Sequence, residues 1–181
     1  MTRSFKRRIG MESIIVSKKP VIKVKGCPVG HTERTVWCGP YALALLSGLS
    51  YDEVYKKALR KIRALKKSYE YKPTSIKGMY PSELTAVAKT LKTPFAFERL
   101  DGRKNKRDQL TLTKAMDYLK PNRVYVVMIT DHFLVVNTSD WTYCDSVDRG
   151  WYSVKSCSYA RSKVDRVGEV KRHKLEVSDV K

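Results

Sequence analysis

The sequence predicts a single α+β domain in which helices come first and an antiparallel sheet follows. Two observations lead to this expectation. Up to about residue 119, apolar residues recur mainly at the three- and four-residue spacing of helices. After Pro121 the chain changes to short β-branched and aromatic runs separated by polar turns. Helices that precede the strands, rather than alternate with them, favour an α+β fold. A chain of 181 residues, 42% of them hydrophobic, can bury one such core without a second domain.

The N-terminal residues 1–20 are expected to form a basic arm, and residues 21–181 the folded domain. The longest apolar run of the arm is Ile14-Ile15-Val16, which is too short for a signal peptide. Residues 21–26 alternate in polarity and are predicted to form a short strand. No apolar run approaches the ~20 residues of a membrane-spanning helix, so we expect no transmembrane segment and a cytoplasmic location.

Three helices are predicted in the first half of the chain. Residues 39–47 are almost entirely apolar, which indicates a buried central helix that ends at Gly48. Ser50 and Glu53 have the spacing of a capping box, which opens a second helix that reaches about residue 67. Its inward-facing residues are expected to be Val54, Ala58, Ile62 and Leu65.

The third helix is expected to start at Pro81, because proline is favoured at the first helical position. Its inward-facing residues would be Leu84, Val87, Ala88 and Leu91. We then expect a strand over residues 94–100, a charged loop over 101–109 and a short helix over 113–119. The strands of the second half are predicted in the segments RVYVVMIT, HFLVVNT, WTYCDS and GWYSV, with a further strand in VGEVKRHKLEV.

Cys38 is predicted to lie at the start of the central helix, within the segment Trp37-Cys38-Gly39-Pro40-Tyr41. A helix N-terminus offers unpaired N–H groups and a partial positive charge, and both stabilise a thiolate. Cys38 is therefore the candidate nucleophile.

His132 and Asp145 are the candidate partners of this thiol. The segment NTSD (137–140) is typical of a turn, and a turn centred between Thr138 and Ser139 pairs residues whose numbers sum to 277. His132 and Asp145 would then lie directly opposite each other, with Cβ atoms ~5 Å apart. Asn137 is the rival partner, but its odd separation from His132 places it on the other face of the strand.

Taken singly, each of these residues has an ordinary structural explanation. The cysteine could be a small buried apolar residue, the histidine a hydrogen-bonded strand residue and the aspartate a local turn former. Their chain order, their element types and the expected hairpin register agree, however. Together they favour catalysis by a nucleophile, a general acid–base and an orienting carboxylate.

The segments CGPYALALLSGLSYDEV, GMYPSELTAVAKTLKTPF and DHFLVVN with YCDS resemble a papain-like cysteine peptidase domain, of the C39-like and bacteriophage-encoded kind. The resemblance covers about residues 30–150. It implies a papain-like fold, a Cys38/His132/Asp145 triad, a protein or peptide substrate, and a phage or bacterial origin, with a location in the host cytoplasm or virion if the protein is phage-encoded.

The oxyanion position departs from the pattern that this family implies. The family places a glutamine about six residues before the nucleophile, where this chain has Thr32 preceded by His31. The backbone N–H of Cys38 would supply one donor, and Thr32 or His31 is the candidate for the second. Loss of one such donor typically costs ~10²–10³ in rate, which leaves room for a weak enzyme or a pseudoenzyme.

The net charge of +19, from 37 basic and 18 acidic residues, predicts attraction to polyanions. A face of the second helix, with the loop beyond residue 100, is the candidate nucleic-acid surface; the alternative is a solvated basic face. Its candidate residues are Lys56, Arg60, Arg63, Lys67, Arg103, Lys104, Lys106 and Arg107.

Three functions are therefore carried forward. The first is a papain-like cysteine hydrolase that cleaves peptide or isopeptide bonds. The second is a non-enzymatic basic protein that binds nucleic acid or is packaged in a virion. The third is another acyl transfer, such as that of an amidase or a transglutaminase-like enzyme. We expect no cofactor and no metal, because no two of the four cysteines have Cys-x-x-Cys spacing.

Overall fold

A computed structural model describes residues 24, 36–66, 73–100 and 109–175 of the chain. The predicted arm (1–20) and the charged loop, apart from Gln109, lie outside these ranges. So does the predicted strand over 21–26, apart from Val24.

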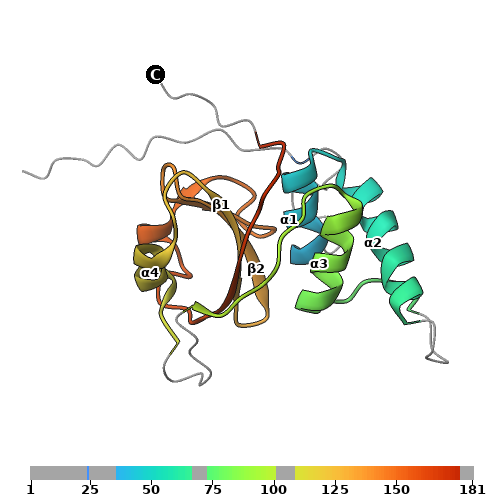
Figure 1. Ribbon diagram of the computed structural model, residues 1–181, viewed down its shortest axis with the longest axis horizontal. Helices are drawn as coiled ribbons and strands as arrows, with labels where there is room; N and C mark the ends of the chain where they lie inside the picture. The colour runs from blue at the N-terminus through green and yellow to red at the C-terminus, as the bar shows by residue number, and fades with distance from the viewer. Residues whose placement is uncertain (1–23, 25–35, 67–72, 101–108, 176–181) are drawn as a thin grey trace, which may run out of the picture.

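The described residues form a layer of helices packed on an antiparallel sheet, which confirms the α+β class (Figure 1). The helices are α1 (Cys38–Ser47), α2 (Tyr51–Leu65), α3 (Pro81–Thr90) and α4 (Leu112–Ala115), with the 3₁₀ turns η3 (Met116–Tyr118) and η4 (Val154–Ser156). The strands are β1 (Val124–Ile129), β2 (His132–Asn137), β3 (Thr142–Cys144), β4 (Tyr152–Ser153) and β5 (Val164–Glu169). Their order across the sheet is β4-β3-β2-β1-β5.

Helix α1 is the buried central helix that the sequence predicts. Its residues from Gly39 to Ser47 are all buried, and it contacts α2, α3 and β2. It ends at Gly48, whose φ of 69° lies in the left-handed region that glycine adopts without strain. The expected stop at Gly48 is confirmed.

Helix α2 begins with the predicted capping box, in which Ser50 accepts from the backbone N–H of Glu53 and the Glu53 carboxylate accepts from Ser50 N. Three of the four predicted inward residues are buried, namely Val54, Ala58 and Ile62. Leu65 is 47% exposed, so that part of the prediction is wrong. Leu65 is the last residue of α2, one turn beyond Ile62, where the core no longer covers the helix.

The predicted strand over 94–100 is wrong. Within this segment only Glu98 pairs with the sheet, through an isolated antiparallel bridge to Val167 of β5. Phe95 packs across Gly168 rather than beside the strand, in the space that a Cβ atom would fill. The segment therefore crosses over the edge strand instead of extending the sheet. The last strand also begins earlier than predicted, at Val164.

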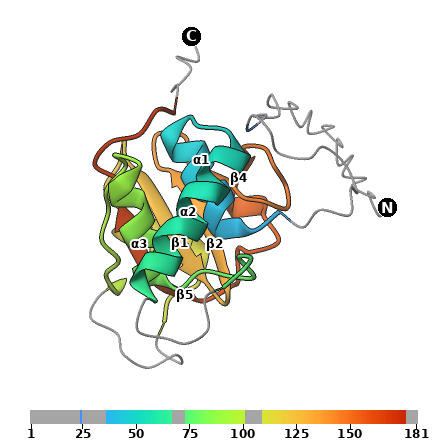
Figure 2. The same ribbon diagram turned by 90° about the vertical axis from the view of Figure 1, so that its right-hand side faces the viewer.

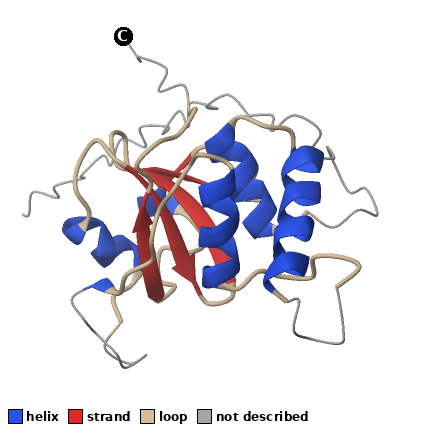
Figure 3. Cartoon of the chain, turned by 45° about the vertical axis from the view of Figure 1, so that its right-hand side comes forward, coloured by secondary structure: helices blue, strands red, loops and turns tan. Residues whose placement is uncertain are grey.

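The sheet has a core on each face. On one face Val126, Phe133 and Val135 pack with α1, α2 and α3 (Figures 1 and 2). On the other face Val127 and Leu134 pack with α4, η3 and η4, and Figure 3 shows a short helix on that side. Because both faces are covered, β1 and β2 are continuous apolar runs. Within the described part of the chain, no helix has the length and apolar character needed to cross a bilayer.

Candidate active site

The structure brings Cys38, His132 and Asp145 together at one end of the sheet. Cys38 is the first residue of α1, His132 is the first residue of β2, and Asp145 directly follows β3. His132 Nε2 lies 2.7 Å from Asp145 Oδ2, and the Cys38 thiol lies close enough to the imidazole to interact with it. The predicted His–Asp contact is thus present, and the thiol approaches it from the helical layer.

The register behind that prediction is wrong, although the contact forms. Strands β2 and β3 pair Val135 with Cys144 and Asn137 with Thr142, so that paired numbers sum to 279. The turn is centred one residue later than expected, with Trp141 at a φ of 56°. The rival Asn137 accepts from the N–H of Ser139 in this turn and does not reach the imidazole.

The His132–Asp145 contact still forms because the register differs from the predicted one by two residues, which leaves both side chains on the same face of the sheet. In the observed register Asp145 falls opposite Leu134, two residues along β2 from His132. Positions two residues apart on a strand share a face, so the carboxylate reaches the imidazole diagonally. A one-residue shift of the register would instead have placed Asp145 on the far face of the sheet.

The Asp145 carboxylate is buried and held in place by several donors. Its Oδ1 accepts from the backbone N–H groups of Val147 at 3.1 Å and Asp148 at 2.8 Å. Burial would raise the pKa of this carboxyl, but the hydrogen bonds from His132, Asp148 and the Tyr159 hydroxyl hold it below its usual value. Asp145 is therefore ionised and fixed in orientation.

The His132 imidazole is held in the protonated form. Burial would lower its pKa, but the hydrogen bonds and charges of Asp145 and Cys38 raise it to about 9. Because Nε2 is bonded to Asp145, Nδ1 is the ring nitrogen available to the thiol. The ring of Tyr159 stacks on the imidazole at 5.4 Å between centroids.

The Cys38 thiol has a pKa below its usual value. Burial would raise it, but the hydrogen bond and charge of His132 and the backbone hydrogen bonds of Phe133 and Gly39 outweigh that effect. Pro40 has no N–H, and the N–H of Tyr41 bonds to Trp37 O, so Cys38 and Gly39 carry the open donors of the first turn. The site therefore favours a thiolate–imidazolium pair.

The other two described cysteines have a different character. Burial raises the pKa of the Cys144 thiol to about 12, and its sulfur lies 3.7 Å from the Tyr41 hydroxyl. Burial also raises the pKa of the Cys157 thiol, which donates to Val154 O. Within the described ranges, Cys38 alone among the cysteines has a lowered pKa.

Tyr159 is the site residue that sequence reasoning missed. It follows Asp145 by fourteen positions and lies in a turn region between η4 and β5, where no periodic pattern marks its direction. It is also one of eleven tyrosines in the chain, so composition does not distinguish it.

Several predicted site residues lie outside the described ranges. These are the oxyanion candidates Thr32 and His31 and the basic residues Lys67, Arg103, Lys104, Lys106 and Arg107. The remaining basic candidates, Lys56, Arg60 and Arg63, are exposed on α2. Arg63 is partly engaged, since its Nε donates to Pro73 O at 2.8 Å.

No group of three or more His, Cys, Asp or Glu side chains among the described residues is arranged to hold a metal ion. Comparison of the chain with family models, with curated proteins and with solved structures gave no match. The functional assignment therefore rests on the geometry of the site.

Proposed function

We propose that the protein is a thiol hydrolase, most simply a papain-like cysteine peptidase, with Cys38 as its nucleophile. One observation carries the proposal: a thiol of lowered pKa at a helix N-terminus lies beside an imidazole that a buried carboxylate orients. That set of groups meets the requirements of nucleophilic acyl transfer. The position of α1 against β2 also supports a papain-like arrangement of the α+β fold.

In the acylation step the Cys38 thiolate attacks the carbonyl carbon of the substrate, and the carbonyl π electrons move to its oxygen. The N–H of Cys38 is the available donor to that oxyanion in the described part of the chain. His132 then gives its Nδ1 proton to the leaving nitrogen as the C–N bond breaks. The products of this step are an amine and a thioester on Cys38.

In the deacylation step the now neutral His132 takes a proton from water, and the hydroxide attacks the thioester carbonyl. The tetrahedral intermediate expels the Cys38 thiolate and releases a carboxylic acid. The proton stays on His132, so the thiolate–imidazolium pair is restored. Asp145 orients the ring and stabilises its positive charge throughout.

Alkylation of Cys38 by iodoacetamide between pH 4 and 9 tests the proposal, with peptide mapping by mass spectrometry to separate Cys38 from the other cysteines. We expect rapid labelling below pH ~7 in the wild type and slow labelling, with an ordinary thiol pKa, in His132→Ala. Cys157→Ser is the matched control and should leave the Cys38 profile unchanged. Slow labelling of wild-type Cys38 with a pKa of ~8.5 would contradict the proposal and favour a non-enzymatic protein.

Product analysis then separates hydrolysis from other acyl transfers. A peptide library incubated with the wild type, with Cys38→Ser as the blank, should give new carboxyl termini that carry one ¹⁸O when the reaction is run in H₂¹⁸O. Incorporation of an added primary amine in place of water would instead indicate a transglutaminase-like transferase. A phage origin, and with it a host-cytoplasm or virion location, is part of the same proposal and follows from the sequence resemblance.

A further inference from the structure

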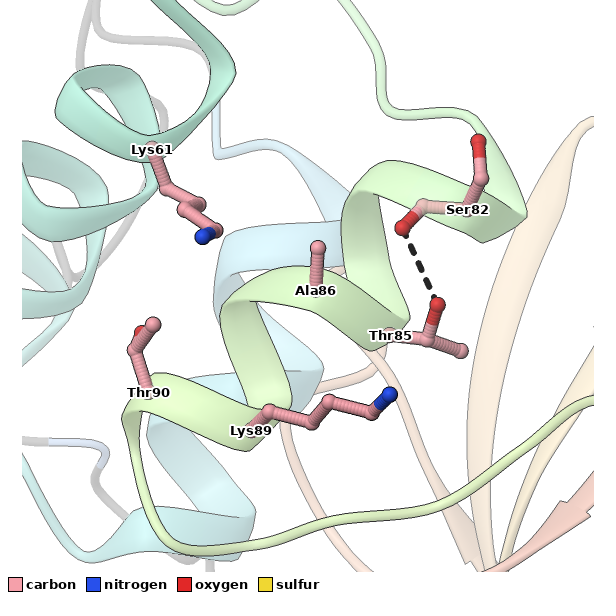
Figure 4. A pocket seen from close by; sticks show the side chains of 6 residues that line it. All are labelled: Lys61, Ser82, Thr85, Ala86, Lys89 and Thr90. Carbon is pink, nitrogen blue, oxygen red and sulfur yellow. Dashed lines mark hydrogen bonds between the residues drawn. The ribbon is translucent and has the colours of Figure 1, made fainter. Parts of the chain in front are cut away.

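A hollow of about 490 Å³ lies between helices α2 and α3, and none of its lining residues belongs to the candidate active site. Figure 4 shows Lys61 extending from α2 toward α3, and Lys89 extending along α3 toward Thr85. The hollow is lined by Lys61, Ser82, Thr85, Ala86, Lys89 and Thr90. No carboxylate is among these residues.

A second hollow of about 420 Å³ adjoins the first, and the two share Thr90. It lies where the end of α1, the end of α3 and the segment after β5 meet. Its basic lining residues are Lys57, Lys92, Arg172, His173 and Lys174, and it too contains no carboxylate. Because the two hollows share this residue at the end of α3, they are treated together and called here the basic groove.

The six lysine and arginine side chains of the basic groove are unneutralised. None of them forms an ion pair with another side chain in the described part of the chain, whereas Lys120, Arg123 and Lys171 all lie within 4 Å of Glu169 beside the sheet. Glu169 thus partly offsets the cations beside the sheet, whereas the cations that line the two hollows have no such partner among the described residues. Such a surface attracts anions strongly at low ionic strength.

The segment that carries Arg172 and Lys174 is held in place by the fold. Lys171 N donates to Pro94 O at 3.2 Å, and Lys174 N donates to Leu46 O at 2.8 Å. Between these anchors, His173 Nδ1 is buried without a hydrogen-bond partner among the described residues. Burial lowers the pKa of His173, so the ring is neutral near pH 7 and can either donate or accept. The segment that lines the groove is thus held in place by backbone hydrogen bonds, and the unpaired Nδ1 of His173 is buried rather than exposed to the groove.

We propose that the basic groove binds the phosphate backbone of double-stranded nucleic acid. Five of its six permanent cations are lysines, which act as point charges toward phosphate, whereas carboxylate recognition favours the bidentate fork of arginine. No Phe, Tyr or Trp side chain lines either hollow, and the one imidazole, of His173, has its Nδ1 buried, so there is no large exposed ring on which unpaired bases could stack. Of the anionic ligands considered, the phosphate backbone of a duplex therefore fits the groove best.

The hydroxyl groups of the groove indicate that charge dominates this binding. Thr85 Oγ1 donates to Ser82 O, as Figure 4 shows, and Thr90 Oγ1 donates to Val87 O at 2.7 Å. These donors are already used within α3. Binding should therefore be strongly salt-dependent and independent of base sequence.

The second hollow and the candidate active site lie toward opposite ends of α1. Cys38 is the first of the 10 residues of this helix, and Ser47, which lines the second hollow, is the last. At 1.5 Å per residue the two ends are about 15 Å apart. Nucleic-acid binding at the groove does not depend on the proposed hydrolase activity.

The test is fluorescence anisotropy of a labelled 25-base-pair duplex of random sequence, titrated with the full-length protein at a series of salt concentrations. The variant Lys61→Gln/Lys89→Gln removes one cation from each wall of the first hollow. The matched control is Lys114→Gln/Lys155→Gln, which removes two exposed cations on the α4 and η4 side of the sheet. Thermal melts and the Cys38 alkylation rate verify that both variants remain folded.

We expect the groove variant to reduce the slope of log K against log salt by about 1.8, or about 0.9 for each lost phosphate contact, while the control keeps the wild-type slope. Equal losses in both variants would show that net charge or another segment binds DNA, and would overturn the assignment to the groove. An unchanged slope of log K against log salt in both variants would also overturn the assignment to the groove. Competition by polyglutamate as effective as that by duplex DNA would also overturn it, because the groove would then fit acidic protein.

Discussion

At the residue scale, Tyr159 gives the candidate site a feature beyond its three central residues. Its ring covers the His132 imidazole, and its hydroxyl is hydrogen-bonded to Asp145. Burial raises the pKa of Tyr159, as does the nearby Asp145 charge, so the hydroxyl remains protonated and acts as the donor. The side chain thus shields the His–Asp hydrogen bond from water and supplies the carboxylate with a further donor. It is a positioning residue.

Replacement of Tyr159 by alanine should lower the pKa of His132 from about 9 toward the ordinary value near 6.5. Water that enters the vacated space would screen the charges of Asp145 and Cys38 from the imidazolium. Titration of the imidazole by NMR measures the shift. Tyr159→Phe keeps the stacked ring and should retain most of the raised pKa, while Tyr118→Ala, at an exposed tyrosine, is the control. An unchanged pKa in Tyr159→Ala would show that the ring has no shielding role.

Asp145 should contribute to activity mainly through its negative charge. Asp145→Asn keeps an oxygen near His132 Nε2 but removes the charge that stabilises the imidazolium, so the thiolate–imidazolium pair becomes less populated. We expect the rate of Cys38 alkylation at pH 6 to fall, and turnover of any identified substrate to fall by ~10² or more. Asp140→Asn, outside the site, serves as the matched control. A wild-type rate in Asp145→Asn would remove the carboxylate from the mechanism.

At the element scale, the start of α1 positions the thiol, and Gly39 is the residue that allows this position. A Cβ atom on Gly39 would lie 2.8 Å from Met79 Sδ and 3.2 Å from Leu84 Cδ1. Met79 can move, but Leu84 is fully buried in α3. The missing side chain therefore lets α1 pack closely against the start of α3, directly beside Cys38.

Gly39→Ala should slow Cys38 alkylation more than it lowers stability. Alanine favours the helix by up to ~1 kcal/mol over glycine, which offsets part of the steric cost, whereas the shift of the helix start displaces the thiol from His132. The double variant Gly39→Ala/Met79→Ala restores space and should recover part of the alkylation rate. Chemical denaturation and alkylation kinetics measure both quantities. A double variant that is no faster than Gly39→Ala would show that Met79 is not the obstacle.

The predictable elements are those whose local signals agree with their packing. The capping box at Ser50 and the stop at Gly48 are encoded within a few residues, so sequence reasoning placed the ends of α1 and the start of α2 correctly. The segment over 94–100 has the apolar character of a strand, but Phe95 packs over Gly168, a partner more than seventy residues away. Local patterns cannot show such a crossing.

The residues of the candidate site could likewise be predicted where a local sequence pattern marks them. Cys38 and His132 were identifiable because each begins an element with a clear pattern, and Asp145 because strand parity survives a change of register. The register itself depends on the turn conformation at Trp141, which the sequence does not reveal. Tyr159 reaches the site from an irregular segment, so only the folded structure places it there.

At the scale of the whole molecule, the thiolate–imidazolium pair should give stability an unusual pH dependence. The folded protein holds one proton in this pair, on His132, between the lowered pKa of Cys38 and about 9. In the unfolded chain the histidine loses its proton near 6.5 and the cysteine near 8.5, so between those values the chain also holds one. Where Cys38 is ionised in the folded state, the two states then hold equal numbers of protons, and the pair contributes no slope of stability against pH in this window.

Cys38→Ser should convert that flat window into a decline. The variant retains Asp145 beside His132, so the imidazole pKa stays raised in the folded state, while the unfolded histidine still titrates near 6.5. The stability from His132 is fully present below pH 6.5 and is lost as pH rises toward its folded pKa. Between these values the folded protein holds one more proton than the unfolded chain, and the free energy of unfolding should fall by up to ~1.4 kcal/mol per pH unit relative to wild type.

Urea denaturation of both proteins from pH 5.5 to 9 measures this difference, because the other titrating groups are shared and largely cancel when the two curves are subtracted. The thiolate–imidazolium pair also determines how the stability of the wild type changes with pH below and above this range. Below pH 6.5 the unfolded wild-type chain binds the extra proton, so wild-type stability should rise with pH there; above pH ~8.5 it should fall. Parallel curves for wild type and Cys38→Ser across pH 6.5–8.5 would mean that Cys38 is not a thiolate in the folded protein, whatever the rate at which it reacts.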